Sequence, residues 1–140
     1  MSNIVRDVMH AKAETAAPET SLAAIVAKMK QEDVGAVPIV DQGKLVGIVT
    51  DRDIALRGFG GAKAADLTAK DVMSKTVASC RDTDTLQAAA KLMETRKVRR
   101  LPVLDAKHAL VGMLSLGDMS QAMSNELSGR LVKAVAEHHA

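Results

Sequence analysis

Apolar positions along the chain alternate between a spacing typical of helices and short continuous runs typical of buried strands. Between residues 22 and 29, and again between residues 86 and 93, apolar side chains recur at i, i+3, i+4 and i+7, on one face of a helix. Hydroxyl and acidic residues suited to N-caps precede each stretch, at residues 19–21 and 82–84. The positions predicted to enter the core are Leu22, Ile25, Val26 and Met29 in one helix and Leu86, Ala89, Ala90 and Met93 in the other.

Two short apolar runs follow each predicted helix and indicate a β-hairpin. The first run contains a proline, in Ala36–Val40 and in Arg100–Leu104, and we expect it at a sheet edge or a strand start because proline cannot donate to the ladder. Turns at residues 41–44 and 105–108 lead to a second run that ends in a hydroxyl residue, where another helix is predicted. With an extended segment at its start, each repeat takes the order β-α-β-β-α. Continuous apolar runs favour sheets covered by helices, so we expect a mixed α/β (α+β) fold, its sheets packed face to face with helices outside.

This pattern occurs twice. Arg6–Met9 matches Lys70–Met73, and the same separation relates the apolar helix positions and the two prolines. One extra residue in the turn near His108 then lengthens the separation by one, which predicts a duplicated unit with a single loop insertion. We assign residues 1–60 to the first repeat, 61–66 to a glycine-rich linker, 67–123 to the second repeat and 124–140 to a C-terminal amphipathic helix or tail. The apolar side of that helix would be Leu127, Leu131, Ala134 and Val135.

Composition narrows the classes of function. The 140 residues are 47% hydrophobic, enough for a sizeable core, and 19 Lys and Arg residues against 17 Asp and Glu residues give a net charge of +2. No block of like charge calls for a nucleic acid as partner, and Phe59, the only aromatic residue, leaves no stacking platform for a single strand. A bound purine would have to lie between aliphatic side chains.

Cysteine and histidine usage bears on location and catalysis. The single cysteine, Cys80, excludes an internal disulfide and fits a reducing compartment, and no apolar run approaches the roughly 20 residues of a membrane span. We therefore expect a cytoplasmic protein with no membrane partner. The four histidines are scattered, with no paired nucleophile and no cluster spaced for a metal, so neither an enzyme nor a metal site is predicted.

The most distinctive stretch lies where the second strand of each hairpin meets the next helix. Gly47–Asp53 and Gly112–Asp118 share a glycine, then a hydroxyl residue, then an aspartate three positions later. One interpretation is a capping box, in which hydroxyl and carboxylate satisfy the unpaired N–H groups of the helix. The other is a ligand site, because a helix N-terminus offers donors to phosphate while a carboxylate accepts hydrogen bonds from ribose hydroxyls. The sequence leaves both open, and the duplication strengthens the second.

Three features in order, Asp-Val-Met at the start of each repeat, the apolar-Pro-apolar strand and Gly-x-x-[Thr/Ser]-x-x-Asp, resemble the cystathionine-β-synthase (CBS) domain. The likeness covers about residues 2–123, and a tandem pair of such domains forms a Bateman module. Val34–Pro38 and Thr50–Leu56 look like the small stand-alone bacterial CBS-pair proteins, the group that includes the hypoxic response protein. The resemblance implies a pseudo-twofold module with two clefts, paired into a homodimer.

The resemblance further implies a regulatory ligand, AMP, ADP, ATP or S-adenosylmethionine, with no required cofactor, and a protein target that responds to it. It assigns both aspartates to ribose and both hydroxyl residues to ribose or phosphate. Basic residues before the proline strand face phosphates in nucleotide-binding members, and here they match Arg99 and Arg100, whose planar guanidinium groups suit phosphate oxygens. The first repeat has Gly35 and Ala36 there instead, with Arg52 as a nearby substitute. The candidate ligand-binding residues are Thr50, Asp53, Val77, Arg99, Arg100, Pro102, Ser115 and Asp118.

A ligand-independent dimerisation or protein-interaction scaffold is the alternative. In that case both corners are only caps, the C-terminal helix makes the contact, and the basic residues 96–100 are a solvated helix end that complements the dipole. In other members of the family the module is attached to a catalytic barrel such as inosine-monophosphate dehydrogenase, for which 140 residues leave no room.

Overall fold

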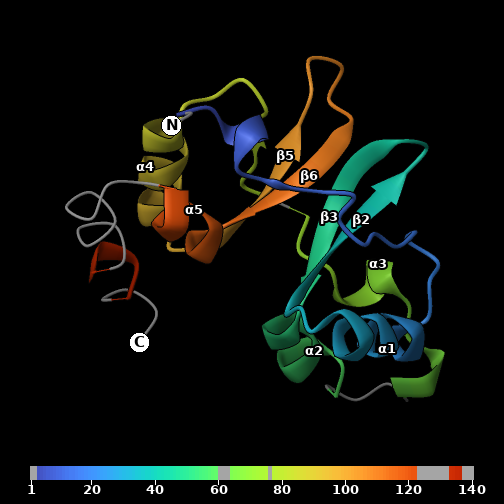
Figure 1. Ribbon diagram of the computed structural model, residues 1–140. Helices are drawn as coiled ribbons and strands as arrows, with labels where there is room; N and C mark the ends of the chain where they lie inside the picture. The colour runs from blue at the N-terminus through green and yellow to red at the C-terminus, as the bar shows by residue number, and fades with distance from the viewer. Residues whose placement is uncertain (1–2, 60–63, 76, 123–132, 137–140) are drawn as a thin grey trace. The chain divides into compact units, whose positions relative to one another are not determined.

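The computed structural model describes residues 3–59, 64–75, 77–122 and 133–136 (Figure 1). The chain divides into two compact units. The first unit is Glu14–Val77, and the second unit combines Met1–Ala13 with Ala78–Ala140. Each unit is a mixed α+β structure, as the sequence predicted, and each has its own core.

The first unit is built on a β-hairpin with helices at one end (Figure 1). Strands β2 (Ala36–Asp41) and β3 (Lys44–Thr50) pair antiparallel through a two-residue turn, Gln42 and Gly43, whose φ angles of 51° and 80° suit a primed hairpin turn. Helices α1 (Leu22–Glu32), α2 (Asp51–Arg57) and α3 (Ala69–Val72) and the 3-10 turn η2 (Ala64–Asp66) complete it. Their shared core consists of Ala16, Leu22, Ile25, Val37, Ile39, Val49, Ala69 and Val72.

The second unit repeats this plan around a four-stranded sheet in the order β1-β6-β5-β4. Its strands are β1 (His10–Ala11), β4 (Cys80–Arg81), β5 (Arg100–Leu104) and β6 (Leu110–Ser115), and its helical segments are η1 (Val5–Asp7), α4 (Leu86–Arg96) and α5 (Leu116–Ala122). Strand β1 pairs antiparallel with β6, and β4 pairs parallel with β5. The turn between β5 and β6 holds the inserted residue, and Asp105 Oδ1 closes it by accepting from the backbone N–H of Lys107 at 2.8 Å and Ala109 at 3.0 Å.

The opening segments of the two repeats are exchanged. Residues 3–13 begin the first repeat in sequence, yet they belong to the second unit, where His10 pairs with Met113 of β6. Residues 67–75 begin the predicted second repeat, yet they belong to the first unit, where Ser74 pairs with Ile48 of β3. The predicted sequence repeats and the structural units therefore differ in these openings, and η2 lies within the predicted linker.

The repeated glycine of each signature strand makes room for the exchanged segment. A Cβ built on Gly47 would lie 2.5 Å from Met73 Sδ, and a Cβ on Gly112 would lie 2.7 Å from both Met9 Sδ and the His10 carbonyl oxygen. Both distances are far below van der Waals contact. The methionine of each Asp-Val-Met thus packs on the glycine of the other repeat, which couples two motifs that are distant in sequence.

The predicted helices are confirmed, with two corrections. Val26 is 44% exposed, so the apolar face of α1 is narrower than predicted, whereas Leu86, Ala89, Ala90 and Met93 of α4 are all buried. The N-cap of α1 is Ser21, within the predicted range, and Ser21 Oγ accepts from Ala24 N–H at 3.2 Å. The N-cap of α4 is Thr85 rather than residues 82–84, because Asp84 turns back to accept from Arg81 N–H at 2.8 Å.

Both prolines avoid the loss of a ladder hydrogen bond, although one of them lies in an interior strand. Pro38 of β2 accepts at its carbonyl from Ala16 N–H at 3.1 Å, on the side away from β3. Strand β5 runs between β6 and β4, so the expectation of an edge is wrong for Pro102. The pairing with β4 begins only at Val103, which leaves the proline nitrogen beyond the end of that short strand.

The C-terminal region is described only in part. Residues 133–136 are helical, and Val135 is fully buried in the core of the second unit, whereas the rest of the predicted helix 124–140 lies outside the described residues. Among the helices that the structure describes, none has the length and apolar character to cross a membrane.

Candidate functional site

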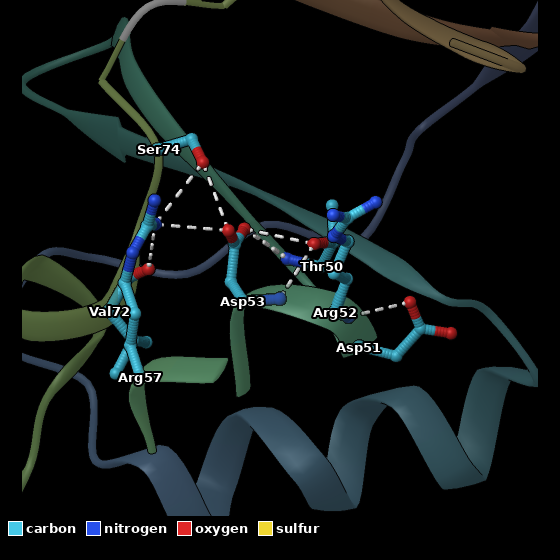
Figure 2. Close-up of polar contacts among 7 residues, drawn as sticks. All are labelled: Thr50, Asp51, Arg52, Asp53, Arg57, Val72 and Ser74. Carbon is cyan, nitrogen blue, oxygen red and sulfur yellow. Dashed lines mark hydrogen bonds and ion pairs between the residues drawn. The ribbon is translucent and has the colours of Figure 1, made fainter. Parts of the chain in front are cut away.

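The first corner is the junction of β3 and α2, and it forms the predicted capping box (Figure 2). Thr50 Oγ1 accepts from Asp53 N–H at 3.1 Å, and Asp53 Oδ2 accepts from Thr50 N–H at 2.9 Å. The extended φ and ψ of Thr50, −107° and 164°, are those of an N-cap residue. Hydroxyl and carboxylate here satisfy the helix end, as the structural interpretation of the motif predicted.

Further bonds hold the Asp53 side chain inside the first unit. Asp53 is 7% exposed, and its Oδ1 accepts from Arg57 Nη1 at 3.0 Å and from Ser74 Oγ at 3.0 Å. Arg57 Nη1 also donates to the Val72 carbonyl oxygen at 3.0 Å (Figure 2). Sequence reasoning missed both partners, although Arg57 stands four positions after Asp53 on one helix, a spacing at which side chains meet.

The second corner joins β6 to α5, and fewer hydrogen bonds among the described residues hold its carboxylate. Asp118 N–H donates to Ser115 Oγ at 3.0 Å, and Ser115 N–H donates to Asp118 Oδ2 at 3.2 Å, so the capping pair is present here too. Asp118 is partly buried rather than buried. The two corners therefore share their backbone plan and differ in what surrounds the carboxylate.

The predicted arginines lie against this second corner. Arg100 is opposite Ser115 in the pairing of β5 with β6, and the Arg99 carbonyl oxygen accepts from Leu116 N–H at 2.8 Å. Both arginine side chains are exposed. Two cations, a hydroxyl residue and a partly buried carboxylate thus come from adjoining backbone within one unit.

The first unit carries small residues at the same places. Ala36 is opposite Thr50, and the Gly35 carbonyl oxygen accepts from Asp51 N–H at 3.0 Å, which reproduces the backbone geometry of the second corner without a cation. Arg52 lies on the exposed first turn of α2. Its role as a substitute phosphate ligand stays a prediction.

The two remaining candidates, Pro102 and Val77, are uncharged and at least partly buried. Pro102 is buried opposite Met113, and Val77 is partly buried at the end of the first unit. The candidate set is therefore divided: Thr50, Asp53 and Val77 belong to the first unit, and Arg99, Arg100, Pro102, Ser115 and Asp118 belong to the second.

Comparison with known proteins identifies the family. A model of the CBS domain matches residues 5–58 and 69–125, once for each repeat. The chain belongs to the CBS-domain family. This CBS pair is 36% identical over 136 residues to the CBS domain-containing protein YhcV of Bacillus subtilis, covering 96% of each chain. It is 30% identical over 132 residues to hypoxic response protein 1 of Mycobacterium tuberculosis, covering 93% of this chain and 92% of the relative. The predicted likeness to stand-alone CBS-pair proteins is confirmed.

One solved structure of a similar CBS pair contains a nucleotide. The structure of CBSX2 in complex with AMP, a protein of Arabidopsis thaliana, superimposes with a TM-score of 0.78 at 29% identity and covers 86% of this chain and 96% of that one. The AMP belongs to that protein.

Matches to enzymes involve only a part of each enzyme. Inosine-5'-monophosphate dehydrogenase of Methanocaldococcus jannaschii is 29% identical over 139 residues, which span 95% of this chain and 26% of the enzyme. The likeness therefore rests on the CBS pair. Within the described part of the chain, no group of three or more His, Cys, Asp or Glu residues could hold a metal ion, and His138 and His139 lie outside that part.

Proposed function

We propose that this CBS pair is a regulatory module that binds an adenosine nucleotide of the AMP or ATP type and acts through a homodimer. The observation that carries the proposal is the second corner, where Arg99 and Arg100 adjoin Ser115 and Asp118. The AMP complex of CBSX2 supports the same class of ligand.

The chemistry of the corner fits the parts of a nucleotide. A carboxylate accepts hydrogen bonds from both hydroxyls of a ribose, and Asp118 is only partly buried, within reach of solvent. Guanidinium groups pair bidentately with phosphate oxygens, which suits Arg99 and Arg100 to the phosphate end. The first unit has Gly35 and Ala36 at these positions, so the phosphate contact is assigned to the second unit.

The test is calorimetric titration of the full chain with AMP, ADP, ATP, S-adenosylmethionine and adenosine. Asp118→Ala should lower the affinity of the chain for each of the ligands that bind, by more than about 10-fold, because hydrogen bonds to a charged group contribute about 1.5–3 kcal/mol each. Arg100→Ala should weaken the phosphate-bearing ligands by about 10-fold or more and leave adenosine within about 2-fold.

A matched control is Arg96→Ala, which removes an exposed arginine from the last turn of α4 without touching the corner. It should leave affinities unchanged. Equal losses for adenosine and AMP in the Arg100 variant would contradict a phosphate role, and no binding of any adenosine compound at millimolar concentration would contradict the proposal as a whole.

A ligand-independent scaffold stays the second candidate because of two exposed apolar side chains. Leu56 is 65% exposed and Phe59 is 74% exposed, at the end of α2 and just after it, and large apolar groups at a surface often mark an interaction site. Sedimentation velocity with and without AMP separates the candidates. A dimer that dissociates in the Phe59→Ser variant and whose sedimentation coefficient is unchanged by AMP would favour the scaffold. A dimer whose sedimentation coefficient changes with AMP would favour the sensor.

A further inference from the structure

The Asp53 carboxylate has no acceptor capacity left for a ligand. A carboxylate offers about four lone-pair positions. Oδ2 of Asp53 accepts from the Thr50 backbone N–H and from the Thr50 hydroxyl, both at 2.9 Å, and Oδ1 accepts from Arg57 and from Ser74, both at 3.0 Å (Figure 2). Ribose hydroxyls could bind this aspartate only by displacing bonds that already exist.

The donors that fill Oδ1 are themselves held in place. Ser74 exchanges both backbone hydrogen bonds with Ile48 of β3, at 2.9 and 3.0 Å, so the sheet fixes the backbone from which its hydroxyl reaches Asp53. Arg57 Nη1 contacts the Val72 carbonyl oxygen at 3.0 Å and Ser74 Oγ at 3.4 Å besides the carboxylate. The half-exposed guanidinium therefore bridges α2 to the last residue of α3 and to Ser74, and its Nη1 makes three contacts at this corner.

The second unit has neither an arginine nor a serine at the corresponding positions. The position that matches Arg57 is Ala122, whose side chain packs against the core, and the position that matches Ser74 is His10, whose pairing with Met113 repeats that of Ser74 with Ile48. Among the described residues, the Asp118 carboxylate accepts one hydrogen bond, from Ser115 N–H at 3.2 Å. Within the part of the chain that the structure describes, most of its acceptor positions are therefore unfilled.

We infer that Arg57 and Ser74 close the Asp53 corner to ligands, so that each chain binds one nucleotide, on the Asp118 carboxylate. The inference rests on the proposed nucleotide binding and adds to it which corner is used and which residues decide this. In the first corner, Arg57 binds the carboxylate oxygen that would otherwise accept a hydrogen bond from a ribose hydroxyl.

The experiment counts adenosine and AMP bound per full-length chain, by equilibrium dialysis and calorimetry. The wild-type chain should bind one equivalent, Asp118→Asn should reduce the affinity by more than about 10-fold, and Asp53→Asn should leave the affinity within about 2-fold. The double variant Arg57→Ala with Ser74→Ala should bind close to two equivalents of adenosine. Adding Asp53→Asn to the double variant should remove the second equivalent.

Lys30→Ala is the matched control, because it removes an exposed cation of the first unit, in the last turn of α1, and Lys30 is not one of the donors to Asp53. This variant should still bind one equivalent of adenosine. Circular dichroism melting establishes that each variant is folded. If the wild-type chain binds two equivalents and Asp53→Asn loses one of them, the inference is overturned and the proposed function stands. A folded double variant that still binds only one equivalent of adenosine would have the same consequence. A wild-type chain that binds neither compound would overturn the proposed function itself.

Discussion

Gly112→Ala tests whether the repeated glycine is needed for the exchanged opening segment. The new Cβ would lie 2.7 Å from the His10 carbonyl oxygen and 2.7 Å from Met9 Sδ. The carbonyl belongs to β1, which is paired with β6, so it can retreat only if the two strands separate. Overpacking of this kind costs about 1–3 kcal/mol. Because alanine is about 0.5–1 kcal/mol better than glycine within a strand, the middle of the two ranges gives an expected net loss of about 1 kcal/mol, and the upper limit is about 2.5 kcal/mol.

Gly47→Ala is the matched variant in the other unit, and it should cost less. Its Cβ would lie 2.5 Å from Met73 Sδ and 3.0 Å from the Ser74 carbonyl oxygen. The closer atom is in a flexible thioether side chain that can change rotamer, and the backbone oxygen needs to move by only a few tenths of an ångström. The expected net change is within about 1 kcal/mol of zero.

Urea unfolding followed by far-UV circular dichroism measures both changes, with a coincident transition in size-exclusion elution volume as the check on two-state behaviour. Gly117→Ala in α5 is the control, because its Cβ would meet only Ser115 Oγ at 3.8 Å. Alanine is the better helix former, so this variant should be as stable as the wild type or up to about 1 kcal/mol more stable. A Gly112 variant as stable as the wild type, or less destabilised than the Gly47 variant, would refute the packing argument.

Three further predictions concern burial and charge. Burial raises the pKa of Cys80 from 9.0 to about 12, so the thiol should react with a disulfide reagent at pH 8 only after urea unfolding, and rapid labelling of the folded chain would contradict this. The stability that the protonated thiol contributes should be fully present below pH 9 and be lost as the pH rises toward 12. Met93→Ala should lower the free energy of unfolding by about 2–5 kcal/mol because Met93 is fully buried, whereas Val26→Ala on the exposed side of α1 should change it by no more than about 0.5 kcal/mol. Similar urea midpoints for the two variants would contradict this assignment of the core. Hydrogen bonds from Thr68 hold the pKa of Asp71 below its ordinary 3.8, so this carboxylate contributes stability that is present above pH 3.8 and lost as the pH falls through the lowered pKa. Asp71→Asn should flatten that part of the plot of urea midpoint against pH, and an unchanged plot would contradict this role of Asp71.

Local features of the sequence were enough to predict the elements and the corners. The helical spacing from Leu86 to Met93 reports one buried face directly, and the spacing of Thr50 and Asp53 is that of a capping box. Such signals depend on residues within one or two turns of each other. They failed where a cap had alternatives, as at Thr85, which follows several other residues that could cap a helix.

The exchange of opening segments could not be predicted in the same way. Because the two repeats carry the same Asp-Val-Met, each segment has equivalent local chemistry on either hairpin, and periodicity does not distinguish the two pairings. The signal was present in Gly47 and Gly112, which mark close backbone approach without naming the segment that approaches. For the same reason the bond from Ser74 to Asp53, between residues far apart in the chain, had no local signature.

The differences between the corners run in one consistent direction. Around Asp53 the chain supplies donors that fill the carboxylate and small residues where a phosphate ligand would stand. Around Asp118 it supplies arginines beside the corner and, among the described residues, a single hydrogen bond to the carboxylate. An arginine that saturates a ribose acceptor is tolerable only where no ribose binds, and phosphate-binding arginines are useful only where the acceptor is open. The joint occurrence of both features in each corner is therefore what a division into one structural and one ligand-binding corner requires, and a pair of simple helix caps would not need it.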